Sequence, residues 1–216
     1  MKTQYEGDPG FVETVDFDAL ARHGDCVSAR ALIAALSNDD PHIAVLAEEA
    51  ILVHLTNPSA AEPLIGALSS ESPRVYVAAS LALARIGTPA VPPLMKALRG
   101  RDEHIRCGAA LVLGSLGDHR AVRPLLMLLS DRTESIRVRA NAVEALGELK
   151  AEESVPVLLH TLVDHSVEVR RRSAEALGSI GDTRAFWPLR RALYDRDASV
   201  RLAADEALEM LGKMAA

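Results

Sequence analysis

The feature that most constrains this chain is a pattern that recurs about every 31 residues along most of its 216 residues. Each unit starts at a Val or an Ile, and a glycine closes four of the units, at Gly87, Gly117, Gly181 and Gly212. Tiled units of this length are typical of solenoids, in which one unit buries its apolar face only against its neighbours. The starting residues, spaced 30 to 33 positions apart, are Ile43, Val75, Ile105, Val138, Val169 and Val200.

Each unit carries two helical stretches. In VRRRSAEALGSIG, the residues Val169, Leu177 and Ile180 fall on one face of a helix with 3.6 residues per turn. A second apolar stretch follows the closing glycine, and Asp118 and Asp182 are suited to cap it. It has a proline near its start, which the first turn of a helix tolerates. These prolines are Pro63, Pro93, Pro124, Pro156 and Pro188.

The pattern predicts an all-α protein, an α-α superhelix of about 13 helices in antiparallel pairs. We expect one solenoid over residues 11–216, preceded by a flexible tail at 1–10. The solenoid starts with an imperfect hairpin at 11–38, continues through five repeats over about 39–195, and ends in a closing helix at 196–216.

The composition agrees with close-packed helices. Hydrophobic residues make up 49% of the chain and aromatic residues only 3%, whereas sheets favour β-branched and aromatic side chains. No apolar run approaches the ~18 residues of a membrane span, and the start lacks a secretory signal, so we expect a cytoplasmic protein without membrane contact. Cys26 and Cys107 lie two to three repeats apart, too far for a disulfide.

The motifs DRDASVRLAADEAL and LGSIGDTRAFWPL resemble HEAT repeats, and within them the short type named after phycobilisome lyases. The resemblance covers about Asp39 to Gly212. It implies the helical solenoid fold, but it says little about function, because such modules serve many unrelated roles.

One HEAT-like enzyme family, deoxyhypusine hydroxylase, binds a di-iron centre through His-Glu pairs in its first helices. This chain has no His-Glu dipeptide, and GSLGDH and GSIGDT lack the preceding strand of a dinucleotide site. We therefore expect no catalytic residues, no metal and no cofactor. The positions that correspond to the His-Glu pairs hold Val77-Ala78, Cys107-Gly108, Ala140-Asn141, Arg171-Arg172 and Leu202-Ala203.

An arginine follows the starting residue in four units, at Arg106, Arg139, Arg170 and Arg201. A cation near a helix N-terminus is opposed by the helix dipole, so these arginines need acidic partners. The family resemblance implies that they form a structural ladder between repeats. The candidate acids precede each arginine: Asp102, Glu134, Asp164 with Glu168, and Asp195 with Asp197.

The neighbouring Arg171 and Arg172 fall outside the ladder. We expect them to lie on a solvated face, partly paired with Glu175 three and four residues away. Binding of a nucleic acid by this arginine run is the alternative, and the net charge of −6 disfavours it.

The resemblance implies that second helices line a concave face, where we expect the binding site. Trp187, Arg191 and Tyr194 share one side of the last second helix, and such residues are common anchors of protein interfaces. The alternative is that Trp187 and Tyr194 only cap the end of the stack. The strip continues towards the N-terminus through His160, Met127, Arg123, Lys96 and Arg99.

Two functions follow as hypotheses. The first is a non-enzymatic scaffold or adaptor that binds another protein on its concave face, with self-association through the stack end near 208–214 as a further possibility. The alternative is a bilin lyase or chromophore-handling subunit, which the repeat type resembles, with arginines that pair with propionates and stack on pyrrole rings.

Overall fold

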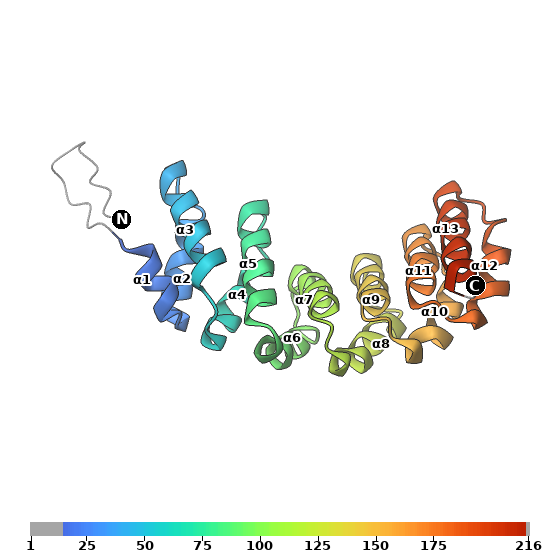
Figure 1. The fold of residues 1–216 in the computed structure, drawn as a ribbon. Coiled ribbons are helices and arrows are strands. Elements are labelled where there is room, and N and C mark those ends of the chain that lie inside the picture. The colour runs from blue at the N-terminus through green and yellow to red at the C-terminus, as the bar shows by residue number, and fades with distance from the viewer. Residues whose placement is uncertain (1–14, 215–216) are drawn as a thin grey trace.

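The computed structural model describes residues 15–214, and in this part all regular structure is helical. Thirteen α-helices follow one another, so the expected all-α solenoid of about 13 helices is confirmed (Figure 1). The expected tail at 1–10 lies outside the described residues. The helices are α1 (Phe17–His23), α2 (Cys26–Ala35), α3 (Pro41–His54), α4 (Ala61–Ala67), α5 (Pro73–Ile86), α6 (Val91–Ala97), α7 (Glu103–Leu116), α8 (Val122–Ser130), α9 (Ile136–Glu148), α10 (Val155–Thr161), α11 (Val167–Ile180), α12 (Phe186–Ala192) and α13 (Ala198–Met214).

Two kinds of helix alternate along the stack. We call α3, α5, α7, α9, α11 and α13 the first helices, and α2, α4, α6, α8, α10 and α12 the second helices. From α2 to α13, each first helix packs on the second helix that precedes it. The first helices are longer, with 13 residues in α9 and 14 in α11, against 7 in α10 and α12.

A short 3-10 turn joins each first helix to its second helix. Gly117 and Gly181 end α7 and α11 at φ of 69° and 79°, the left-handed region that costs glycine least. Asp118 and Asp182 then cap the 3-10 turn and not the second helix, because each carboxylate accepts the N–H two residues further on. The second helix continues from that turn without a cap of its own.

One continuous hydrophobic core runs through the stack, and its side chains recur with the repeat. Leu83, Leu113, Leu146 and Leu177 occupy the same position in four successive first helices, and each is fully buried. Burying one leucine contributes about 2 kcal/mol to stability. The core therefore forms only when neighbouring repeats are stacked, as the sequence pattern requires.

The stack bends into an arc in which the first helices lie on the inner side and the second helices follow the outer edge (Figure 1). From α7 onward the first helices pack closely on one another, whereas neighbouring second helices are splayed apart. The cause is a glycine facing an alanine: a Cβ on Gly147 would lie 2.9 Å from Cα of Ala176. Gly114 with Ala145 and Gly178 with Ala207 repeat this contact.

The first helices are spaced more widely at the N-terminal end of the stack. The position of Gly114 and Gly147 is held by Leu52 in α3 and Ala84 in α5, and α3, α5 and α7 make looser contacts with one another. As a result, Val45 and Val77, on the sides that face the next repeat, are 50% and 48% exposed. The size of the residue at this one position of each first helix thus determines how closely that helix packs on the first helix of the next repeat.

The last helix presents a charged outward side. In α13, Asp205 and Glu209 stand where α11 has Ala174 and Gly178, and both are exposed. Another repeat packed there would remove the carboxylate of Asp205 from water, which is unfavourable without a cation to pair with it. The same positions that join the inner repeats therefore carry charged side chains in α13.

Candidate functional site

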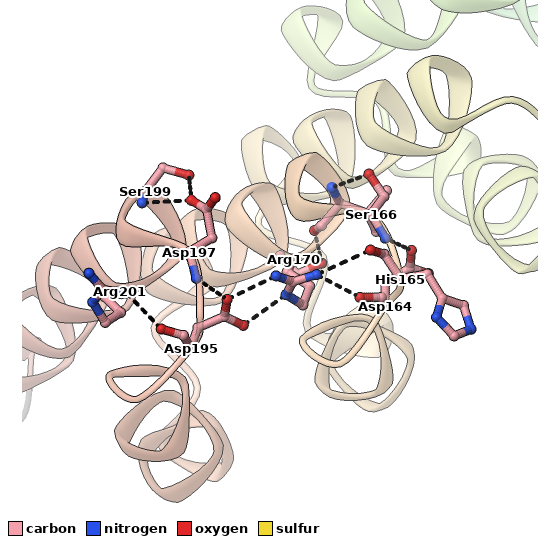
Figure 2. Close-up of polar contacts among 10 residues, drawn as sticks. Asp164, His165, Ser166, Arg170, Asp195, Asp197, Ser199 and Arg201 are labelled. Carbon is pink, nitrogen blue, oxygen red and sulfur yellow. Dashed lines mark hydrogen bonds and ion pairs between the residues drawn. The ribbon is translucent and has the colours of Figure 1, made fainter.

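The arginines after the starting residues tie each repeat to the next. Arg170, in the first turn of α11, donates from Nε and Nη2 to the two carboxylate oxygens of Asp195, both at 2.8 Å (Figure 2). Its Nη1 donates to the backbone carbonyl of Asp164 at 2.9 Å. Its side chain is only 5% exposed. These hydrogen bonds raise the pKa of Arg170 and hold the pKa of Asp195 below its usual range.

The arrangement recurs in the two preceding repeats. Arg106 donates to both carboxylate oxygens of Glu134, at 2.8 and 2.7 Å, and Arg139 pairs with Asp164. Each acid belongs to the repeat after the arginine, so the expectation that the partner precedes its arginine is wrong. Arg201, in the last helix, donates to the backbone carbonyl of Asp195 at 2.8 Å and has no acidic partner among the described residues.

The triple-arginine run is neutralised by carboxylates. Arg171 pairs with Glu168 and Glu175, while Arg172 pairs with Glu168 and with Glu144 of the neighbouring α9. We expected only Glu175 from the sequence, because Glu144 comes close only when the repeats stack. The run therefore presents no cluster of unpaired guanidinium groups to a phosphate.

The strip from Trp187 to Lys96 lies on the second helices and the loops that follow them, so its expected place on a concave face is wrong. The second helices follow the outer edge of the arc (Figure 1). Trp187 is 71% exposed and Tyr194 is 89% exposed, so neither side chain plugs the gap to α13. The alternative that they act as a packing cap is contradicted by this exposure.

Trp187 is part of a small cluster that the sequence did not suggest. The ring of Phe186 meets the Trp187 ring edge to face, with centroids 5.3 Å apart. The guanidinium of Arg190 lies 5.9 Å from the Phe186 centroid and 6.0 Å from the Trp187 centroid. Cation–π contacts of this kind hold an arginine in place while leaving its N–H groups free to donate.

We define the second-helix edge as the exposed residues of the second helices and of the loops directly after them. Arg123, His160, Arg99 and Arg191 are all exposed there. Lys96 pairs with Glu62 at 3.5 Å, so it is partly neutralised. The five most exposed large hydrophobic side chains of the described part all lie on this edge: Tyr194 89%, Val163 78%, Val27 73%, Trp187 71% and Met127 66%.

The second helices themselves are basic, although the whole chain has a net charge of −6. In residues 15–214, the second helices carry Arg30, Lys96, Arg123, Arg190 and Arg191 against the single acid Glu62. Because neighbouring second helices are splayed, shallow pockets open between them. One of about 280 Å³ separates α6 from α8 and includes Arg99 and Met127 in its wall.

The described part offers no set of metal ligands. Residues 15–214 contain no group of three His, Cys, Asp or Glu side chains placed to hold a metal ion.

Cys26 and Cys107 are both free thiols, and burial raises the pKa of Cys107 to about 11. Among the described helices, none is both long and apolar enough to span a membrane alone; Pro73–Ile86 with Thr88–Ala97 passes only as a pair bent by 111°.

Stacked antiparallel helix pairs define the class of protein as an α-solenoid. A family model for HEAT repeats matches residues 29–99, 61–137 and 131–209, and the chain belongs to this family. The fold resembles that in the structure of the complex of CpcE and CpcF of phycocyanin lyase from Nostoc sp. PCC7120. That likeness has a TM-score of 0.65 at 21% identity and covers 70% of this chain and 99% of the other.

Deoxyhypusine hydroxylase is a second kind of relative. The enzyme from Schizosaccharomyces pombe is 40% identical over 78 residues, which are 36% of this chain and 24% of the relative. The human enzyme has a TM-score of 0.51 at 25% identity, over 91% of this chain and 78% of the other. The positions expected for His-Glu pairs here hold residues such as Ala140 and Asn141.

Proposed function

We propose that this chain is a non-enzymatic scaffold that binds another protein through the second-helix edge. The observation that carries the proposal is that the five most exposed large hydrophobic side chains of the described part all lie along that edge. Exposed apolar side chains that gather on one face of a soluble protein mark interaction sites. The edge combines them with tryptophan, tyrosine and arginine, the residue types enriched at the energetic centres of interfaces.

The shape of the edge determines how a partner docks. Trp187 lies in α12 at the outer edge of the arc (Figure 1) and Tyr194 in the loop that follows, and both are highly exposed, so they act as anchors that enter a pocket of the partner. The concave-groove binding expected from the sequence is replaced by contact with a protruding ridge. Lys96, Arg99, Arg123, Met127 and His160 extend the ridge along the neighbouring repeats.

The experiment is a quantitative pull-down from cells of the source organism with the tagged chain as bait. The triple variant Trp187→Ala/Arg191→Ala/Tyr194→Ala should lose the proteins that the unaltered chain captures. A matched variant, Val77→Ala/Leu81→Ala, removes side chains that are each 48% exposed on the first helix α5 and should keep them. Equal capture by the triple variant and the unaltered chain would contradict the proposal.

Handling of an open-chain tetrapyrrole has no support beyond the likeness in fold, so we favour the scaffold. Continued stacking of a second copy on α13 is likewise disfavoured, since Asp205 and Glu209 face outward there. Light scattering after gel filtration should give the mass of one chain. A mass of two chains that returns to one on Leu202→Glu would show self-association through this end.

A further inference from the structure

The basic residues near the second-helix edge fall into two groups. Arg120 and Arg184 each hold the aspartate two residues earlier, Asp118 and Asp182, at 2.6 Å. These two carboxylates cap the 3-10 turns, so the pairs belong to the fold. By contrast, the four arginines of the second helices, Arg30, Arg123, Arg190 and Arg191, form no ion pair with an acid within residues 15–214, and neither does Arg99 in the loop after α6.

The unpaired arginines stand beside the most exposed apolar side chains. In α12, Arg190 and Arg191 follow Trp187 by three and four residues, which places them on neighbouring parts of one helix surface. In α8, Arg123 precedes Met127 by four residues. Any partner that covers Trp187 or Met127 therefore removes water from a guanidinium, and an acidic group must replace that water to avoid a desolvation cost.

We infer that the second-helix edge binds an acidic segment of another protein in which carboxylates alternate with apolar side chains. The carboxylates pair with Arg123, Arg190 and Arg191, and the apolar side chains cover Met127, Val163, Trp187 and Tyr194. Arg190 is held over the rings of Phe186 and Trp187, so little side-chain freedom is lost when it forms a bidentate pair. This inference rests on the proposed scaffold function and specifies the chemistry of the partner.

Single-stranded nucleic acid is the other class of ligand that combines negative charge with affinity for aromatic rings. Two features of the edge favour a protein. Met127 and Val163 are aliphatic, and they offer no flat ring on which a base stacks. Glu152 and Glu153 are exposed beside the start of α10, where they oppose a continuous phosphate backbone but leave room for separate carboxylates.

Fluorescence anisotropy with defined probes tests the inference. The probe is a short fluorescein-labelled peptide of repeating Glu-Glu-Leu-Phe, compared with peptides of repeating Lys-Lys-Leu-Phe and Glu-Glu-Ser-Ser and with an oligothymidylate. The unaltered chain should bind the first peptide about tenfold more tightly than each of the others. The variant Arg123→Glu/Arg190→Glu/Arg191→Glu should reverse the preference between the Glu and Lys peptides.

A matched pair of single variants controls for net charge. Arg191→Glu and Arg137→Glu change the charge equally, but Arg137 lies exposed on the first helix α9. Only Arg191→Glu should weaken the binding of the Glu-Glu-Leu-Phe peptide to the chain. Circular dichroism verifies that both variants keep their helices, so that a loss of binding reports on the surface.

The inference is overturned if the acidic peptide does not bind, if the Lys peptide binds as well, or if the oligothymidylate binds more tightly. The pull-down experiment distinguishes failure of this inference from failure of the proposed scaffold function. If the pull-down partners are lost with Trp187→Ala/Arg191→Ala/Tyr194→Ala but kept with Arg123→Glu/Arg190→Glu, the scaffold stands and the acidic segment is wrong. If neither variant changes capture, both proposals fail.

Discussion

The guanidinium of Arg170 donates two hydrogen bonds of 2.8 Å to the carboxylate of Asp195, which lies 25 residues further along the chain. The same guanidinium donates to the carbonyl of Asp164 in the loop before its own helix. One side chain thus joins two loops that belong to successive repeats (Figure 2). The Val-Arg signature of the sequence therefore encodes the junction between repeats.

Arg170→Ala should lower the free energy of unfolding by about 3 kcal/mol, because it leaves the carboxylate of Asp195 and a loop carbonyl without their donor. Urea unfolding followed by circular dichroism measures the change. Arg201→Ala is the matched control, since Arg201 is exposed and bonds only to a backbone carbonyl, and it should cost less than about 1 kcal/mol. Equal losses for both variants would contradict the ladder.

The same pair predicts how stability depends on pH. Arg170 lowers the pKa of Asp195 in the folded chain below its unfolded value. The stabilisation is therefore complete above the unfolded pKa and is lost as the pH falls through the lowered folded pKa. Asp195→Asn should reduce the acid dependence of the unfolding free energy below about pH 4, where unfolded aspartate titrates. An unchanged acid slope would show that the pair does not contribute.

Gly147→Ala should destabilise the stack by about 1–3 kcal/mol, because its Cβ would lie 2.9 Å from both Cα and Cβ of Ala176 and would push α9 from α11. Gly66→Ala is the control, as a Cβ there meets nothing within 4 Å. That variant should be neutral or stabilising by up to about 1 kcal/mol, because alanine favours the helix. The midpoints of thermal unfolding distinguish the two.

The two thiols should react at different rates with a disulfide reagent. Cys107 is buried at 3% exposure, and its pKa of about 11 leaves roughly one thiolate in a thousand at pH 8. Cys26 is partly exposed. We expect one thiol to titrate in the native chain and the second only after unfolding. Cys26→Ser should remove the early reaction, and a fast reaction in that variant would contradict the burial of Cys107.

Trp187 is the only tryptophan, so intrinsic fluorescence reports on the second-helix edge alone. Because its side chain is 71% exposed, the free chain should emit at wavelengths typical of solvated indole and be quenched readily by acrylamide. Binding of a partner at the edge should shift the emission to the blue and reduce quenching. A blue-shifted, poorly quenched spectrum of the free chain would restore the packing-cap interpretation.

Most of the fold could be predicted from the sequence, because helix periodicity, glycine stops and first-turn prolines are local signals. The boundaries of α11 follow from Ser166 and Gly181, which cap its two ends. The exact partners of the arginine ladder could not be predicted in this way. Asp195 is near Arg201 in sequence, but only stacking shows that its carboxylate turns back to Arg170.

The prediction that the candidate site lies on a concave face was wrong for a different reason. The direction in which the stack bends depends on distances between helices, and no single helix encodes it. A signal was nevertheless present in the sequence. Gly147 and Gly178 recur at a position that Leu52 and Ala84 occupy in the first two repeats, and this difference indicates which helices approach most closely.

The charged outward side of α13 has a consequence for where a further repeat could be added to the stack. Duplication of an inner unit, such as α9 with α10, would place glycine and alanine against each other at both new junctions. A unit appended after the last helix would meet Asp205 and Glu209 instead. A unit inserted among α7, α9 and α11 would therefore keep the close glycine–alanine packing, whereas a unit placed on the outward side of α13 would not.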